Sequence, residues 1–102
     1  MNIIIAGAGE VGFHLAKMLS GENHQITIID RDEVRLNQIA ETSDVVPISG
    51  IPTSVATLEK AGIGRCDLFI AVSPADAQDV NIVSALLAKQ MGAKRVTARI
   101  NN

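Results

Sequence analysis

Short apolar runs rich in Ile and Val alternate with stretches of helical periodicity along the whole chain. The apolar runs predict strands at residues 2–6, 26–30, 45–49, 68–72 and 96–100. The periodic stretches between them predict helices at about residues 10–19, 32–41, 54–61 and 77–91. Because this alternation is typical of a parallel sheet covered by helices, we predict an α/β fold.

The third predicted strand contains Pro47, which cannot donate a hydrogen bond to a neighbouring strand. Proline is tolerated at the edge of a sheet, and the strand order 3-2-1-4-5 places this strand at an edge. We therefore predict a Rossmann-like, doubly wound parallel sheet with that order, in one domain over residues 1–102. A doubly wound fold normally adds a sixth strand, so we expect this chain to be truncated before that strand.

Two of the predicted helices carry apolar faces of different width. The helix at 10–19 is expected to place four apolar residues on one face: Val11, Leu15, Met18 and Leu19. The helix at 77–91 carries more apolar residues than one contact with a sheet requires: Val80, Ile82, Val83, Leu86 and Leu87. We expect another chain to bury part of this second surface.

The first predicted strand leads directly into a glycine-rich motif, Gly7-Ala8-Gly9-Glu10-Val11-Gly12. In a G-x-G-x-x-G turn, the first glycine allows the tight turn, the second lets the backbone approach a pyrophosphate, and the third lets the helix pack on the strand. Phosphate oxygens would face the unpaired N–H groups around Ala8 to Val11, at the positive end of the helix.

Asp30 ends the second apolar run, at close to the roughly 20-residue spacing from the glycines that a dinucleotide-binding unit requires. Its carboxylate can accept hydrogen bonds from an adenosine ribose and would repel a 2′-phosphate. The motif and the acid together therefore predict a site for NAD or a simple adenine nucleotide rather than for NADP.

Composition limits the other classes of partner. The net charge is −2 and the only aromatic residues are Phe13 and Phe69, so we expect no nucleic-acid partner. No apolar run approaches the roughly 18 residues that span a bilayer, which predicts no direct membrane insertion. The single cysteine, Cys66, and the absence of a signal-peptide pattern predict a cytoplasmic location.

The predicted elements contain no recognisable catalytic group or metal site. Three residues that could ligate a metal are not spaced to do so: His14, His24 and Cys66. Ser73 lacks the G-x-S-x-G turn and the base of a serine nucleophile, and its hydroxyl is better suited to contact a ribose or phosphate. Three polar residues near the start of the last helix are expected to act mainly in capping: Asp76, Asp79 and Asn81.

Over nearly its whole length the chain resembles the N-terminal nucleotide-binding domain of TrkA, also called the RCK or KTN domain, of bacterial potassium transport. The segments 2–12 and 28–32 match this family, but generic dehydrogenases share both. The segments that favour the family lie later in the chain: Gly50, residues 58–63, residues 71–73, Asn81 and residues 98–102.

The resemblance implies a cytoplasmic regulatory subunit that binds NAD or NADH, or alternatively ATP or ADP. It also implies a homo-oligomer, a dimer or larger, that gates an integral-membrane potassium-translocating subunit and through it lies at the inner face of the membrane. Carried onto matching positions, the phosphate loop comprises Gly7, Ala8, Gly9, Glu10, Val11 and Gly12. The remaining implied contacts are Asp30 with the ribose, Arg31 beside adenine or phosphate, Gly50, Ala71, Val72 and Ser73 along the crevice, and Arg99 at a terminal phosphate or a neighbouring subunit.

The chain departs from the family pattern at three places. Many members carry an acidic or polar residue after the position of Gly50, where this chain has Ile51-Pro52. The segment between Ser73 and Asn81 is longer than usual, which leaves open whether Asp76 and Asn81 contact a ligand. The carboxylate of Glu10 should disfavour ATP relative to NAD by ~1 kcal/mol if it is exposed to solvent.

Two other classes share parts of this pattern. An NAD-binding domain cut from a dehydrogenase would have the same glycines, but it would need a general acid or base beside the nicotinamide, and no His or Lys follows the fourth or fifth strand suitably. A methyltransferase that uses S-adenosylmethionine has a different glycine spacing, with a glycine where this chain has Val11. We therefore predict a nucleotide-sensing domain without enzymatic activity, and keep the dehydrogenase domain as the alternative.

Overall fold

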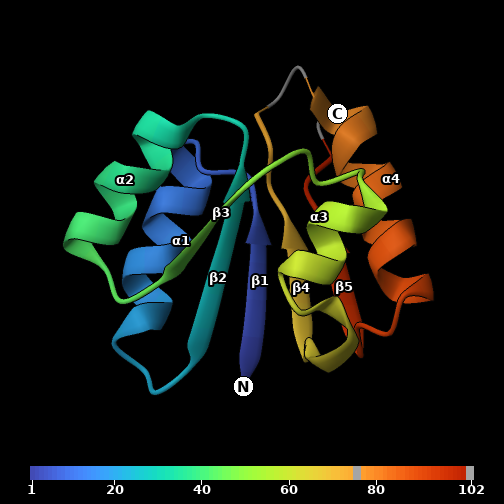
Figure 1. The fold of residues 1–102 in the computed structure, drawn as a ribbon, viewed down its shortest axis with the longest axis horizontal. Helices are drawn as coiled ribbons and strands as arrows, with labels where there is room; N and C mark the ends of the chain where they lie inside the picture. Colours follow the sequence, from blue (N-terminus) through green and yellow to red (C-terminus); the bar gives the residue numbers. More distant parts are fainter. Residues whose placement is uncertain (75–76, 101–102) are drawn as a thin grey trace.

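The computed structural model describes residues 1–74 and 77–100, which fold around one parallel sheet (Figure 1). Its strands are β1 (Asn2–Ala6), β2 (Gln25–Asp30), β3 (Val46–Ser49), β4 (Leu68–Ala71) and β5 (Arg95–Ala98). All four neighbouring pairs are parallel, in the order β3-β2-β1-β4-β5. The predicted fold class and strand order are confirmed, with Pro47 on the edge strand β3.

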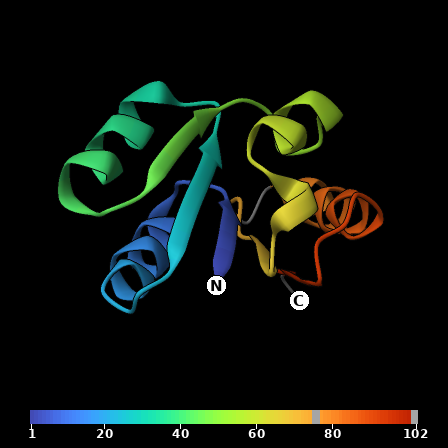
Figure 2. The ribbon, with the colours of Figure 1, turned by 60° about the horizontal axis from the view of Figure 1, so that its bottom comes forward.

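Helices cover both faces of this sheet. They are α1 (Glu10–Ser20), α2 (Glu33–Thr42), α3 (Val55–Lys60) and α4 (Gln78–Gln90), with a short 3₁₀ turn, η1 (Ile63–Arg65), after α3. Figure 2 shows α1 and α2 on one side of the sheet and α3 and α4 on the other. Alternate residues of β1 divide between these layers, since Ile3 and Ile5 join the core under α1 and α2, whereas Ile4 and Ala6 join the core under α3 and α4.

The predicted contact face of α1 is confirmed for Leu15 and Leu19, which pack against the core, and wrong for Val11 and Met18. Val11 and Met18 are exposed, and the residues buried against the sheet are Gly12 and Ala16. The cause is Gly12, because a Cβ at this position would lie 1.8 Å from the Gly7 carbonyl oxygen. This close approach places Gly12 and Ala16 directly against the sheet, with Phe13, Leu15 and Leu19 partly buried beside them.

The face of α4 that contacts the sheet also consists of small or polar residues: Asn81, Ser84, Ala85 and Ala88. Its larger apolar residues are at least partly exposed, and Leu86 keeps 64% of its surface accessible. The prediction of an apolar surface that the sheet does not cover therefore holds for Ile82, Val83 and Leu86.

The strand β5 begins one residue earlier than predicted and ends two residues earlier, at Ala98. It pairs only with β4, and this pairing ends where Ala71 faces Ala98. The Arg99 N–H still donates to the Ala71 carbonyl oxygen at 2.8 Å, so Arg99 lies immediately beyond the end of the strand.

The start of α2 is fixed by a side-chain cap. The Asp32 carboxylate accepts hydrogen bonds from the N–H groups of Val34 at 3.0 Å and Arg35 at 3.3 Å. This side-chain cap places the first turn of α2 directly after β2, where Asp30 ends the strand.

Candidate functional site

The glycine turn between β1 and α1 lies against the end of β4. Gly7 has φ +123°, which side chains rarely tolerate, and a Cβ there would lie 2.7 Å from the Ser73 nitrogen. The Gly7 N–H also donates to the Ile29 carbonyl oxygen at 2.8 Å, which ties the turn to β2. This glycine therefore joins three neighbouring strands at their carboxyl ends.

Asp30 anchors the same turn from the other side. One carboxylate oxygen, Oδ2, accepts a hydrogen bond from the Ala8 N–H at 2.8 Å, and Oδ1 accepts one from the Asp32 N–H at 2.8 Å. The Ala8 amide, expected to be unpaired, is thus engaged. Because each carboxylate oxygen can accept two hydrogen bonds, Asp30 retains capacity for the hydroxyls of a ribose.

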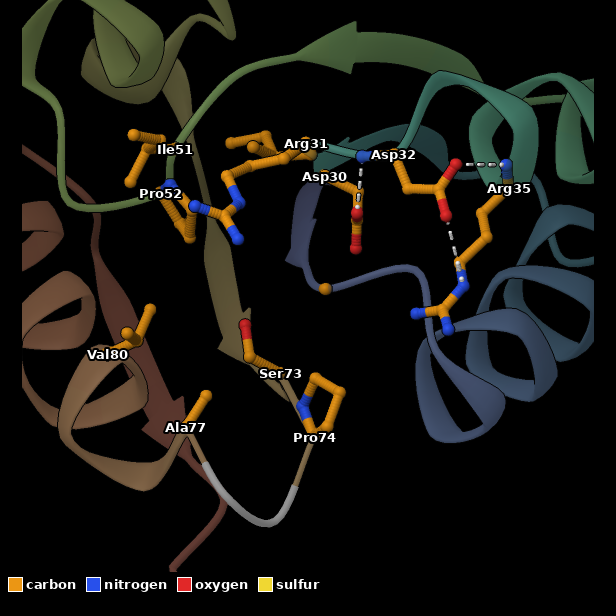
Figure 3. A pocket seen from close by; sticks show the side chains of 12 residues that line it. Asp30, Arg31, Asp32, Arg35, Ile51, Pro52, Ser73, Pro74, Ala77 and Val80 are labelled. Atoms are coloured by element: carbon orange, nitrogen blue, oxygen red, sulfur yellow. Dashed lines mark hydrogen bonds and ion pairs between the residues drawn. The ribbon is translucent and has the colours of Figure 1, made fainter.

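A cleft of about 530 Å³ opens at this end of the sheet, a volume typical of ligand sites. Gly7 belongs to its lining, and most of the other lining residues form two walls (Figure 3). The first wall, which follows β2 and β3, comprises Asp30, Arg31, Asp32, Arg35, Ile51 and Pro52. The second wall, which follows β4, comprises Ser73, Pro74, Ala77 and Val80 among the described residues.

A smaller hollow of about 230 Å³ lies on the other side of the glycine turn. It is lined by Ala8, Gly9, Glu10, Phe13, Arg35 and Gln38. Arg35 contributes to both spaces, and its Nε is 3.5 Å from Asp32 Oδ2. Since this ion pair is long and half exposed, the guanidinium can exchange it for a phosphate at little cost.

The predicted site residues divide into three groups. Four line the cleft: Gly7, Asp30, Arg31 and Ser73. Three line the smaller hollow: Ala8, Gly9 and Glu10. The other six line neither space: Val11, Gly12, Gly50, Ala71, Val72 and Arg99.

The six residues outside both spaces have other surroundings. Gly12 packs on the glycine turn, and Ala71 and Val72 are buried in the core. The Gly50 N–H donates to the Asp30 carbonyl oxygen at 3.0 Å, so its backbone supports the first wall. The Arg99 carbonyl accepts a hydrogen bond from Asn81.

Asn81 is a structural residue in this arrangement. Its side chain is 1% exposed, and its amide bonds to the backbone of Ser73 and Arg99. Asp76, the other residue left open, lies outside the described residues. Asn81 therefore supports the second wall from behind, and its own donors are already in use.

Sequence reasoning missed several residues of the cleft. Arg35 could have been found, because it lies in the first turn of α2, three residues after the Asp32 cap, and therefore close to the carboxyl end of β2. Ile51 and Pro52 depart from the polar pattern of the family, and they give the first wall an apolar surface. Ala77 and Val80 gave no signal, because their place depends on how α4 packs.

The described residues provide no metal site and no membrane span. Within residues 1–74 and 77–100, no group of three His, Cys, Asp or Glu side chains could hold a metal ion. No helix in the same ranges is long and apolar enough to cross a bilayer.

Burial raises the pKa of the Cys66 thiol above its usual value, which favours the unreactive protonated form.

Comparison with known proteins places this architecture in one family. A family model described as the TrkA-N domain matches residues 3–102. The Trk system potassium uptake protein TrkA homolog of Archaeoglobus fulgidus is 46% identical over 102 residues, which are 100% of this chain and 22% of that protein. The chain thus spans less than a quarter of that relative.

Two solved structures share the fold. The Shewanella denitrificans Kef CTD in its AMP-bound form has a TM-score of 0.78 at 22% identity, covering 94% of this chain and 57% of that one. A putative short-chain dehydrogenase/reductase family oxidoreductase of Aeromonas hydrophila has a TM-score of 0.61 at 25% identity, covering 88% of this chain and 52% of that one. The same framework therefore occurs in proteins of different function.

Proposed function

The chain belongs to the TrkA-N family, and from this premise we propose that it is the regulatory nucleotide-binding domain of a potassium uptake system. The observation that carries the proposal is the joint geometry of the glycine turn and Asp30. The carboxylate lies at the mouth of the turn, bonded to the Ala8 N–H, beside a cleft of about 530 Å³. This arrangement fits an adenosine ribose on Asp30 with phosphates above the start of α1.

The proposed ligand is NAD or NADH, with ATP or ADP as alternatives. Ile51 and Pro52 would contact the adenine, and Arg31 and Arg35 would neutralise phosphate charge. The AMP in the related Kef structure supports an adenine nucleotide. An acid at position 30 also favours a free ribose over a 2′-phosphate, which favours NAD over NADP.

The proposed mechanism is differential binding. A nucleotide shifts a gating equilibrium only by as much as it prefers one assembly state over the other. The name of the Archaeoglobus relative supports a role beside a membrane potassium transporter. We propose a homo-oligomer in the cytoplasm that contacts an integral-membrane potassium-translocating subunit, and co-purification of that subunit with the full-length protein tests this assignment.

The alternative is an NAD-binding domain of a dehydrogenase, which the shared fold of the Aeromonas oxidoreductase favours. Hydride transfer needs a group that can take or give a proton beside the nicotinamide. The described residues that line the cleft include no histidine, lysine, tyrosine or cysteine, and both of their acids lie on the first wall. Hydride transfer from the full-length protein to any small carbonyl substrate would favour the dehydrogenase.

The central experiment is calorimetric titration of the chain with AMP, NAD, NADH, ADP, ATP and NADP. We expect at least one adenine nucleotide to bind, and Asp30→Ala to weaken it about tenfold or more, the size of lost charge-assisted hydrogen bonds. The matched control is Asp44→Ala, which removes an exposed acid in the loop before β3. Equal, weak binding of all six compounds, unchanged by Asp30→Ala, would overturn the site assignment.

A further inference from the structure

The side chain of Asn81 occupies an unusual position for a polar group. It lies on the face of α4 that packs against the sheet and is 1% exposed. Its Oδ1 accepts a hydrogen bond from the Ser73 N–H at 2.8 Å. Its Nδ2 donates to the Ser73 carbonyl oxygen at 3.1 Å and to the Arg99 carbonyl oxygen at 3.2 Å. One amide thus satisfies three backbone groups from two strand ends.

These backbone groups lie just where the sheet stops providing partners. The pairing of β4 with β5 ends where Ala71 faces Ala98, and its last hydrogen bond runs from the Arg99 N–H to the Ala71 carbonyl oxygen. Ser73 lies two residues beyond Ala71. Because buried backbone groups must be paired, the Asn81 amide substitutes for the next rung of the sheet.

The position of Ser73 determines the second wall of the cleft. Ser73 and Pro74 line this wall at one end, and Ala77 and Val80 line it at the other, directly before Asn81 (Figure 3). Gly7 packs so closely on Ser73 that any shift of this backbone would also press on the glycine turn. The Asn81 amide therefore fixes the wall that faces Asp30.

We propose that Asn81 is a positioning residue that sets the second wall for the part of the nucleotide beyond its first phosphate. This inference rests on the proposed nucleotide-binding function and assigns a role within that site. An adenosine bound at Asp30 with its first phosphate over the glycine turn occupies the first wall. A second phosphate, and whatever is attached to it, must extend toward Ser73 and the end of β5.

The test compares AMP with two longer probes, ADP and NADH, by calorimetric titration of the chain. Asn81→Asp keeps the size of the side chain and the acceptor for the Ser73 N–H, but it loses both donors. Asn81→Ser is the milder variant, because it introduces no charge at this buried position. The matched control is Ser84→Ala, since Ser84 is equally buried on α4 but its hydroxyl bonds within the helix, to the Asn81 carbonyl.

We expect Asn81→Asp to weaken ADP or NADH about tenfold and AMP less than threefold, with no change in the control. The same loss for all three probes would show that Asn81 supports the fold in general and would overturn the proposal. So would unchanged affinities, or a wild-type protein that binds ADP and NADH no more tightly than AMP. If the wild-type protein binds none of the probes, the proposed function itself fails.

A measurement on the wild-type protein keeps the test decisive if both variants unfold. The Asn81 side-chain NH₂ resonances report directly on the bonds to Ser73 and Arg99. We expect these resonances to shift on saturation with ADP or NADH and to shift less with AMP. Identical spectra with all three probes would contradict the proposal.

Discussion

The first wall of the cleft carries four charged residues, whereas the described lining of the second wall carries none. Asp30, Arg31, Asp32 and Arg35 alternate in sign from the end of β2 to the first turn of α2. Ser73, Pro74, Ala77 and Val80 are neutral and mostly apolar. In the proposed nucleotide site, the first wall would therefore recognise the charged and hydroxyl groups of the ligand, while the second wall would contribute mainly shape.

The two walls are also held in place differently. Asp30 is fixed by backbone N–H groups on residues that lie beside the cleft, so its bonds are open to competition from a ligand. Ser73 is fixed from behind by a fully buried amide that a ligand cannot reach. Ligand binding should therefore rearrange the first wall more readily than the second.

Gly12→Ala should have the largest effect on stability and on nucleotide binding. Gly12 sets the distance between α1 and the glycine turn, and the position of both walls depends on this turn. The added Cβ would meet backbone atoms of Gly7, at 1.8 Å from its oxygen. We expect a loss of about 3 kcal/mol in the free energy of unfolding and loss of nucleotide binding. Urea unfolding followed by far-UV circular dichroism measures the stability, since the chain has no Trp or Tyr.

The matched control for this variant is Gly21→Ala. A Cβ at Gly21 would have no neighbour within 4 Å, and its φ of −85° suits any residue. We expect a change of less than about 1 kcal/mol in the free energy of unfolding. Equal stability of the two variants would show that the packing of α1 does not depend on Gly12.

The different construction of the walls explains how much of the site could be predicted. The strands, the glycine turn and Asp30 depend on local signals, namely apolar runs, a glycine pattern and one acid at a strand end. The contact face of α1 followed from its apolar periodicity only at Leu15 and Leu19, because the close packing of Gly12 decides which side of α1 lies nearest the sheet. The second wall depends on how α4 docks, and Asn81 gives no local sign that its amide completes the sheet.

Arg35→Gln tests whether charge on the first wall contributes to recognition. Arg35 lines both the cleft and the hollow beside Gly9 and Glu10, so its guanidinium can reach a phosphate above the glycine turn. We expect about tenfold weaker binding of ADP, the size of one charge-assisted hydrogen bond. Calorimetric titration measures the affinity. Arg65→Gln, at the opposite end of the sheet, is the control, and the same loss there would indicate a general charge effect.

Glu10→Gln should have a smaller effect, which depends on the ligand. Glu10 is exposed at the start of α1, where its carboxylate faces the position proposed for the phosphates. Removing this charge should raise the affinity for ATP relative to NAD up to about fivefold, or ~1 kcal/mol. Parallel titrations with both nucleotides measure the ratio, with Glu41→Gln at the end of α2 as the control. An unchanged ratio would mean that Glu10 does not face the phosphates.

Asp67 is a charged residue at the opposite end of the sheet, directly before β4, and provides a comparison with both walls. The Asn2 N–H donates to Asp67 Oδ2 at 2.8 Å, and Lys94 Nζ lies 3.2 Å from Oδ1. The Asn2 hydrogen bond, assisted by Lys94, holds the pKa of Asp67 below its usual value. A carboxyl whose pKa is lowered by folding stabilises the protein above its unfolded pKa, and this contribution is lost as the pH falls below about 4.

Asp67→Asn should therefore flatten the acid limb of the stability curve and leave nucleotide affinity at neutral pH unchanged. Thermal melting followed by circular dichroism at several pH values between about 2 and 7 measures the first effect, and calorimetric titration with AMP measures the second. Asp44→Asn, which removes an exposed acid, should keep the wild-type acid limb. A changed AMP affinity in Asp67→Asn would show that the amino ends of the strands influence the cleft. The difference between the two walls would then depend on more than the residues at the carboxyl ends of the strands.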